Sequence, residues 1–223
     1  MNEGVNEMTT FDFGNGPVPA HQHSNGGGWV ADTATVSDTA YVGPNAWVFG
    51  KARVFGKARV YEYAMVSGDA RVYDYAMVSG NAWVLGHAKV YGDARVYGNA
   101  WVFGDARVSG KARVFDNAEV CGNAWVSGDA EVFGNAVVYG NARVYDYAMV
   151  FGKAWVCGDA VVCGDALVSG DAEVSGNAEV SGEAWVYGNA RVSGNAEVTD
   201  YARVFGDAKV FDDARVSGDA RVQ

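Results

Sequence analysis

Valine and alanine recur along this chain with a period of six residues. Val occupies every sixth position from Val30 to Val222, and Ala occupies every sixth position from Ala34 to Ala220, with no insertion between them. Within a unit the two lie two residues apart, so in an extended segment both side chains point to the same face. The period matches neither an α-helix nor a heptad coiled coil, and the pattern therefore predicts strands.

Each six-residue unit predicts one short strand followed by a corner. The consensus is Ala-X-Val-Z-Gly-(Asn/Asp), in which X and Z are the outward positions. Val favours strands, whereas Gly followed by Asn or Asp favours a turn. We expect the Asn or Asp at the second corner place to adopt positive φ, with local variation where Lys51, Lys57, Tyr63, Tyr75 and Tyr147 stand there. Because one such strand cannot bury its inner face alone, the units are predicted to stack as a solenoid.

The stretch Val42-Gly43-Pro44-Asn45-Ala46-Trp47 places an aliphatic residue before a turn and a small residue four positions later. At a strict period of six, this pattern resembles the hexapeptide-repeat left-handed β-helix superfamily. It looks similar to bacterial and phage-borne members that lack the loop insertions of the enzymes. The resemblance implies an all-β fold, a single left-handed parallel β-helix with three hexapeptides per triangular coil. Over residues 29–223 this gives 10 to 11 coils and, at about 4.8 Å per coil, a rod roughly 50 Å long.

The two ends of the repeat differ. Residues 1–28 lack the period, and Phe11, Phe13 and Pro17 are expected to fold over the open end of the solenoid as a cap. The repeat then runs through Val222 without a capping element, so its last coil is predicted to offer unpaired strand groups to another chain. End-to-end self-association is one expectation, and a last coil satisfied by water is the alternative.

Three units per coil would stack residues that are 18 positions apart on one outer face. One such face reads Trp29, Trp47, Met65, Trp83, Trp101, Glu119, Val137 and Trp155, with Phe49, Leu85 and Phe103 beside it. Large outward apolar patches commonly mark contacts, and Trp is enriched among interface anchors. We interpret this Trp ladder as a lateral protein interface, with a homo-oligomer as the simplest partner. Packing of neighbouring aromatic rings on one another is the alternative.

The next face carries cations between aromatic residues. It reads Thr35, Arg53, Arg71, Lys89, Arg107, Trp125 and Arg143, with Phe55, Tyr73, Tyr91 and Tyr145 alongside. Basic and aromatic residues in alternation are typical of anion or nucleic-acid surfaces. A strand spacing of about 4.8 Å fits a phosphate repeat poorly, and stacking of Arg on aromatic rings explains the pattern as well. This alternative is favoured over nucleic-acid binding.

Charge is distributed unevenly along the repeat. Residues 29–116 carry 10 Lys and Arg against 8 Asp and Glu, whereas residues 117–223 carry 7 against 16. The formal net charge of the chain is −10. The different sign of the two halves favours head-to-tail stacking of copies, and an acidic half could also mimic nucleic acid.

Signals for catalysis are sparse. The acyltransferases of the resembling superfamily use an extra loop and a His between subunits, but here no unit is interrupted and only His87 lies in the repeat. We expect His87 to be a solvated corner residue and keep it as the one catalytic candidate. His21 and His23 are a weak candidate pair for a metal ion, because two His separated by one residue share a face in a strand. No cofactor is expected.

These observations favour a non-enzymatic, self-associating scaffold that binds a protein partner. An acyltransferase-like enzyme at a subunit interface, and a phage-type inhibitor that binds or mimics nucleic acid, remain the alternatives. No stretch reaches the roughly 18 apolar residues that cross a bilayer, so no membrane partner is expected. Cys121, Cys157 and Cys163 form an odd set without metal-ligand spacing. They predict free thiols in a cytoplasm, which would be the host's if a phage encodes the protein.

Overall fold

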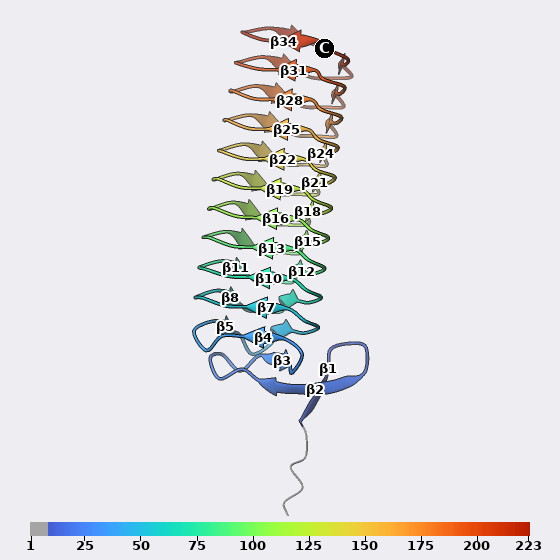
Figure 1. Cartoon of the computed structure of the whole chain (residues 1–223). Coiled ribbons are helices and arrows are strands. Elements are labelled where there is room, and N and C mark those ends of the chain that lie inside the picture. The colour runs from blue at the N-terminus through green and yellow to red at the C-terminus, as the bar shows by residue number, and fades with distance from the viewer. Residues whose placement is uncertain (1–8) are drawn as a thin grey trace, which may run out of the picture.

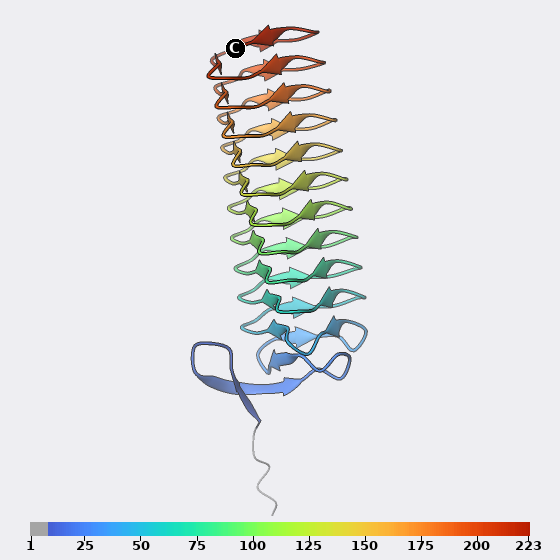
Figure 2. The same cartoon turned by 180° about the vertical axis from the view of Figure 1, so that it is seen from behind.

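The computed structural model describes residues 9–223 and consists of strands, corners and an N-terminal hairpin. Within that range the strands stack as flat rungs of one continuous coil, with the chain start at one end and the chain end at the other (Figures 1 and 2). Each coil contributes one strand to each of three parallel sheets. The predicted all-β parallel solenoid with three strands per coil is therefore confirmed. None of the described residues forms a helix with the length and hydropathy that a bilayer crossing requires.

Sheet 1 begins with the hairpin and then takes every third repeat strand. Its strands are β1 (Thr10–Asp12), β2 (Pro17–Gln22), β3 (Trp29–Ala31), β6 (Trp47–Val48), β9 (Met65–Val66), β12 (Trp83–Val84), β15 (Trp101–Val102), β18 (Glu119–Val120), β21 (Val137–Val138), β24 (Trp155–Val156), β27 (Glu173–Val174), β30 (Arg191–Val192) and β33 (Lys209–Val210).

Sheets 2 and 3 contain 11 parallel strands each. Those of sheet 2 are β4 (Thr35–Val36), β7 (Arg53–Val54), β10 (Arg71–Val72), β13 (Lys89–Val90), β16 (Arg107–Val108), β19 (Trp125–Val126), β22 (Arg143–Val144), β25 (Val161–Val162), β28 (Glu179–Val180), β31 (Glu197–Val198) and β34 (Arg215–Val216). Those of sheet 3 are β5 (Tyr41–Val42), β8 (Arg59–Val60), β11 (Met77–Val78), β14 (Arg95–Val96), β17 (Arg113–Val114), β20 (Glu131–Val132), β23 (Met149–Val150), β26 (Leu167–Val168), β29 (Trp185–Val186), β32 (Arg203–Val204) and β35 (Arg221–Val222).

The interior is a column of small side chains. The repeat Val from Val42 to Val204 and the repeat Ala from Ala40 to Ala202 have no exposed surface. Backbone hydrogen bonds join each rung to the next, as from Trp83 N to Ala100 O at 2.9 Å. The inward assignment of both columns is thus confirmed, and the core extends along the rod without a break.

The corners correct one expectation from the sequence. Positive φ falls on the first corner residue, for example Gly50 at 68° and Gly140 at 73°, and not on the Asn or Asp that follows. A Cβ on Gly140 would lie 2.9 Å from Gly158 O of the next coil. Corners therefore select Gly at the first place for both its φ and the close approach of successive coils.

Acidic residues replace Gly at six corners and adopt the same left-handed conformation. Five of their carboxylates accept a hydrogen bond from the backbone N–H located 18 residues further on. The N–H of Gly92, for instance, donates to Asp74 Oδ2 at 3.2 Å. Each such side chain satisfies a corner donor of the following coil, which offsets the cost of left-handed backbone in a residue with a Cβ.

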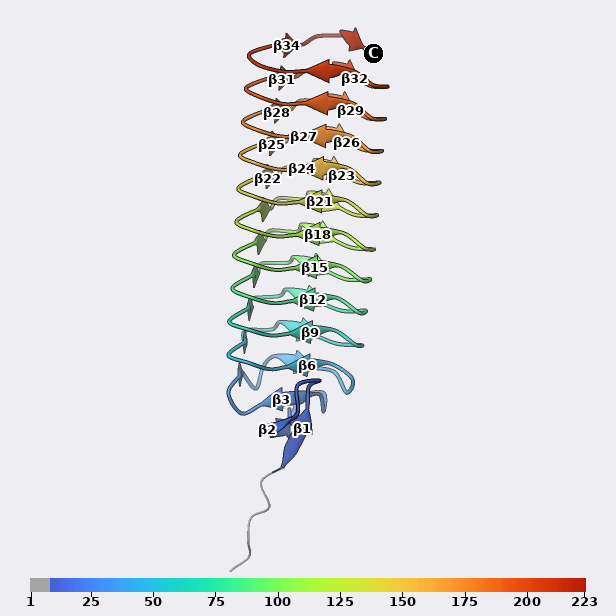
Figure 3. The same cartoon turned by 90° about the vertical axis from the view of Figure 1, so that its right-hand side faces the viewer.

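The N-terminal segment covers the first coil in two ways. Strand β2 pairs antiparallel with β3, and the loop after it bonds to both backbone groups of Val42 through Asn25 O and Gly28 N, each at 3.0 Å. The hairpin of β1 and β2 also lies against the outside of sheet 1 at this end of the rod (Figure 3). Of the expected cap over residues 1–28, residues 1–8 lie outside the described residues, and the rest do form a region without the repeat. Phe11 and Phe13 pack on the outer face rather than across the open interior.

Candidate functional site

The Trp ladder of sheet 1 consists of two parts that differ in what covers them. Phe11 stacks on Trp29 with 4.5 Å between ring centroids, and Phe13 stacks on Phe49 at 5.0 Å. Both Phe rings also meet Trp47 edge to face. The first two rungs of the ladder are therefore occupied by the chain's own hairpin, and a contact with another molecule has to use the rungs beyond them.

The uncovered part of the ladder begins at Met65 on β9. Trp83 and Trp101 stack in parallel with centroids 5.0 Å apart, and Phe103 follows Trp101 on the same rung. Trp101 is 41% exposed and Trp155 is 50% exposed. Ring stacking within the chain and outward exposure thus coexist here. The stack supplies a flat, stiff apolar surface of the kind that anchors interfaces.

The cations of sheet 2 stand in register on consecutive rungs. Arg53 pairs with Arg71, Arg71 with Lys89, and Lys89 with Arg107 as direct strand neighbours. Beside them Phe55, Tyr73 and Tyr91 form one continuous stack with centroids 4.9 and 5.0 Å apart. Burial is the largest cause that raises the pKa of Tyr73 above its ordinary value. The predicted juxtaposition is present, and Arg143 lies further along the same row beyond Trp125.

His87 occupies an exposed corner between β12 and β13. It borders a shallow hollow of about 320 Å³ whose other lining residues are Asp69, Arg71, Lys89, Asp105 and Arg107. None of these lining residues carries a hydroxyl or thiol nucleophile.

The two N-terminal His residues have separate partners. His21 Nδ1 lies 2.8 Å from Asp32 Oδ1 in an exposed hydrogen bond. His23 is 5% exposed, and its Nε2 lies 3.1 Å from Ala40 O. No group of three or more metal-ligating side chains occurs among residues 9–223. His21 and His23 join the N-terminal segment to the first coil through different partners, and the two side chains do not share one.

The three thiols are free and partly or fully shielded. Burial, followed by the charge of Glu119, raises the pKa of the Cys121 thiol, and burial likewise raises that of Cys163. A hydrogen bond to Cys157 raises the pKa of Tyr139 to about 12, and one to Cys163 raises that of Tyr145 to about 12. Thiols held in the protonated form are poor nucleophiles, and burial has this effect on Cys121 and Cys163. The sulfur atoms of Cys157 and Cys163 accept the hydrogen bonds from the hydroxyls of Tyr139 and Tyr145.

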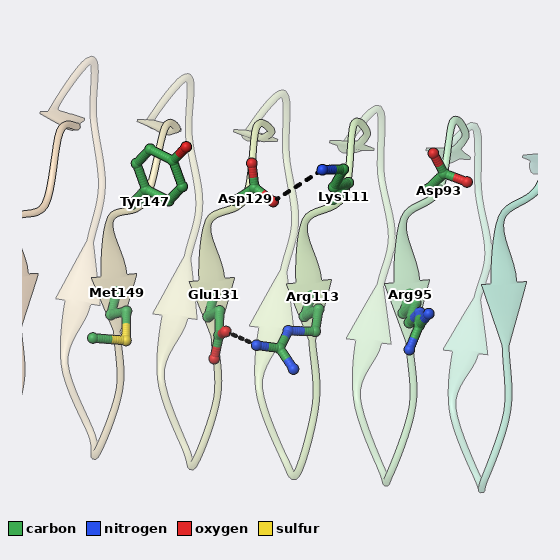
Figure 4. A pocket seen from close by; sticks show the side chains of 8 residues that line it. All are labelled: Asp93, Arg95, Lys111, Arg113, Asp129, Glu131, Tyr147 and Met149. Carbon is green, nitrogen blue, oxygen red and sulfur yellow. Dashed lines mark hydrogen bonds and ion pairs between the residues drawn. The ribbon is translucent and has the colours of Figure 1, made fainter.

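A further hollow lies on sheet 3, a face for which the sequence analysis predicts no site. It measures about 560 Å³ and is lined by Asp93, Arg95, Lys111, Arg113, Asp129, Glu131, Tyr147 and Met149 (Figure 4). Lys111 pairs with Asp129 at 3.9 Å, and Arg113 pairs with Glu131. Stacking at 18-residue intervals would have revealed this face. Its charges are largely neutralised within the chain, so it has little excess charge with which to attract a ligand.

Amide ladders run along two of the corners. Asn81 donates to Asn99, Asn99 to Asn117, and Asn117 to Asn135, over 3.1 to 3.3 Å. A second ladder runs from Asn123 through Asn141 to Asp159, whose carboxylate accepts at 2.9 Å. These side chains bond along the rod axis, which fixes the spacing of the coils.

Comparison with known families agrees with this architecture. The family described as YdcK Beta solenoid repeat matches residues 88–104 and 184–200. Both matched segments lie within the three-sheet coil. A search of curated proteins found no match to the chain. The family match and the three parallel sheets together support a repeat β-helix protein.

Proposed function

We propose that the chain is a non-enzymatic, rigid β-solenoid scaffold that self-associates and binds a protein partner through its outer ladders. The observation that carries this proposal is the uncovered part of the Trp ladder on sheet 1, where Met65, Trp83 and Trp101 occupy successive rungs and Trp155 follows beyond Glu119 and Val137. Its rungs are held by backbone hydrogen bonds, so the surface needs little reordering on association. Low ordering cost favours a binding role for such a face.

Features of the corners and the core also fit a scaffold. A solenoid contacts itself only between neighbouring coils, and its uninterrupted 11-rung sheets leave no inserted loop to build a cleft. The hollow beside His87 is lined by charged groups alone. We further infer a left-handed winding, from the resemblance of the repeat to the hexapeptide superfamily. A reducing compartment is inferred from the three free thiols.

Light scattering over a range of concentrations tests the proposal. We expect the native chain to have a mass above that of the monomer, and we expect the double variant Trp83→Ser/Trp101→Ser to lose the contact made by sheet 1. Trp47 is unsuitable for this purpose because Phe11 and Phe13 already cover it. The matched control is Phe211→Ser, an exposed aromatic on the last rung of sheet 1. A native chain that stays monomeric at the highest soluble concentration would overturn the proposal.

A further inference from the structure

Sheet 2 carries cations that have no acidic partner within the described chain. Among residues 9–223, the Lys and Arg residues that form ion pairs are Lys111, Arg113, Lys153, Arg191 and Arg215. Arg53, Arg71, Lys89 and Arg107 are absent from these pairs although they stand on four successive rungs. Like charges on directly neighbouring strands destabilise a sheet. Asp69 and Asp105 line the hollow beside these cations without reaching ion-pair distance. Opposite charges that approach from outside could therefore still pair with the row.

The opposite charges lie further along the same outward column. Glu179 on β28 and Glu197 on β31 follow Val161 on consecutive rungs. Glu179 is absent from the ion pairs above, whereas Glu197 lies 3.2 Å from Arg215 on the next rung and would share its carboxylate with a cation from outside. The basic and acidic segments of sheet 2 are arranged about Trp125 on β19. Arg71 and Glu179 are each three rungs from Trp125, and Arg53 and Glu197 are each four rungs from it.

We propose that sheet 2 is the interface of a symmetric dimer in which two copies lie side by side and antiparallel, with the two-fold axis at Trp125. The axis runs along the strand direction, so the X column of one copy faces the X column of the other. Each interface residue then meets its counterpart twice, as an isologous contact requires. This inference rests on the proposed self-association and names the face, the direction and the alignment.

The X column is complementary in charge under this arrangement. Arg53 faces Glu197 of the second copy and Arg71 faces Glu179, which gives four opposite-charge pairs by symmetry. Lys89 faces Val161, where its methylene stem can cover the apolar side chain. At the centre the two Trp125 rings meet, and the indole N–H of each already donates to its own Ser109 Oγ at 3.0 Å. Arg107 faces Arg143 beside this pair, where both guanidinium groups can lie against the indole faces.

The Z column is complementary in size under the same alignment. The stacked rings of Phe55, Tyr73 and Tyr91 face Thr199, Ser181 and Cys163 of the second copy, and Tyr145 faces Ser109. Every aromatic residue of this column from Phe55 to Thr199 thus opposes a small one. Alternation of large and small residues across an interface lets two flat sheets interdigitate about 10 Å apart.

Sliding the copies changes the match. An alignment centred between Trp125 and Arg143 still gives two opposite-charge pairs, Arg71 with Glu197 and Lys89 with Glu179. It also places Arg53 against Arg215, which is a like-charged contact. An alignment centred between Arg107 and Trp125 sets Lys89 against Arg143 and Tyr91 against Tyr145. The alignment centred on Trp125 places its single like-charged contact beside an aromatic pair, and we therefore assign it.

The size of this surface sets the expected strength. The surface spans nine rungs, from β7 to β31, which extend about 40 Å along the rod. Each rung contributes four extended residues, from the repeat Ala to the Z position, which give a width of about 13 Å. The flat area is on the order of 500 Å² per copy, or about 1,000 Å² in total, near the lower bound of specific interfaces. A dimer of micromolar affinity that weakens with salt is expected.

Charge reversal in solution tests the pairing. Arg53→Glu/Arg71→Glu and Glu179→Arg/Glu197→Arg should each weaken dimerisation, about a hundredfold or more, because like charges then oppose each other at four places. The variant that combines all four changes should regain native affinity. An equimolar mixture of the two double variants should form a mixed dimer. Analytical ultracentrifugation measures all three, and circular dichroism confirms that each variant folds.

A cysteine on the axis tests the alignment. In a background with Cys121, Cys157 and Cys163 changed to Ser, Trp125→Cys should give a dimer that a short bis-maleimide crosslinks, because sheets about 10 Å apart hold the two thiols too far apart for a direct disulfide. Trp185→Cys on sheet 3 is the matched control, because Trp185 is 40% exposed and Trp125 is 39% exposed. The control should stay unlinked. Equal linkage of both variants would overturn the assigned axis.

The same measurements separate this inference from the broader proposal. In the Trp83→Ser/Trp101→Ser background, the inference expects a dimer that the charge-reversed variants dissociate. If the native oligomer is lost in that background and is unchanged by charge reversal, self-association stands and the role of sheet 2 is overturned. A monomeric native chain overturns both.

Discussion

The inner and outer positions of each strand are governed by different constraints, and strand β21 shows the contrast in two adjacent residues of one type. Val138 points into the core and has no exposed surface, whereas Val137 points outward and is half-buried. The inner columns repeat without exception along the rod, while the outer ladders change from rung to rung. The interior therefore specifies the coil, and the exterior is free to specify contacts.

The sharpest way to break this comparison is to place a charge at each of the two positions. Val138→Asp buries a carboxylate that has no partner and should cost about 4 kcal/mol or more, with adjacent coils lost together. Val137→Asp is the matched control and should cost less than about 1 kcal/mol. Chemical denaturation with circular dichroism compares them, and equal midpoints would refute the inward assignment.

The second largest loss of stability is expected at the N-terminal hairpin, because its Phe residues bury part of the outer face of sheet 1. Phe13 is 7% exposed between Phe11, Trp47 and Phe49. Phe13→Ala should destabilise the N-terminal coils by about 3 kcal/mol. Phe211→Ala, at a site that is 56% exposed, should change stability by less than about 0.5 kcal/mol. Hydrogen exchange resolves the local loss. Unchanged protection of residues 29–48 in Phe13→Ala would count against the cap as a structural cover.

Substitutions at the corners should cost less stability than those in the core and more than those at exposed outward positions. Gly140→Ala forces a Cβ to a φ of 73° and to within 2.9 Å of Gly158 O, at a cost of about 1–2 kcal/mol. Gly140→Asp should cost less, since its carboxylate can accept the next coil's N–H as Asp146 does from Gly164 N. Thermal melting ranks the two variants. The reverse ranking would argue against carboxylate capping.

The smallest effect is expected in the amide ladder, which is outside but still periodic. Asn117→Ala removes one donor and one acceptor from exposed hydrogen bonds and should cost about 0.5–1 kcal/mol. Asn25, whose amide donates to Ala40 O in the cap, serves as a more shielded comparison. If Asn117→Ala exceeds Asn25→Ala in cost, the ladder contributes more than independent hydrogen bonds do.

Most of the fold could be predicted from the sequence because the core is periodic. The Val and Ala columns, and the grouping of Trp83 with Trp101, follow from counting six and eighteen. The placement of Phe11 and Phe13 could not be derived in this way, since residues outside the repeat have no period to place them. The sequence predicts positive φ at the Asn or Asp of the corner from their general tolerance of it, and this prediction is wrong. The residue before them adopts it, which is Gly at most corners and an acidic residue at six.

The candidate surfaces were only partly foreseeable. Sequence spacing brought Arg53, Arg71 and Lys89 together on one face, as the structure has them. It did not reveal that the hairpin covers Trp47, nor that the charges on sheet 3 neutralise one another. Both depend on side-chain contacts between coils or across the cap, which spacing alone does not give.

The eighteen-residue circuit around three sheets has a consequence for how such a chain can change. Losing or duplicating eighteen residues shortens or lengthens the rod and leaves every later side chain on its original side. A loss of only six would preserve the Val and Ala columns yet turn all downstream ladders by one third of a revolution. A single short deletion could thus exchange the tryptophan, arginine and mixed-charge sides of half the molecule while its interior stays intact.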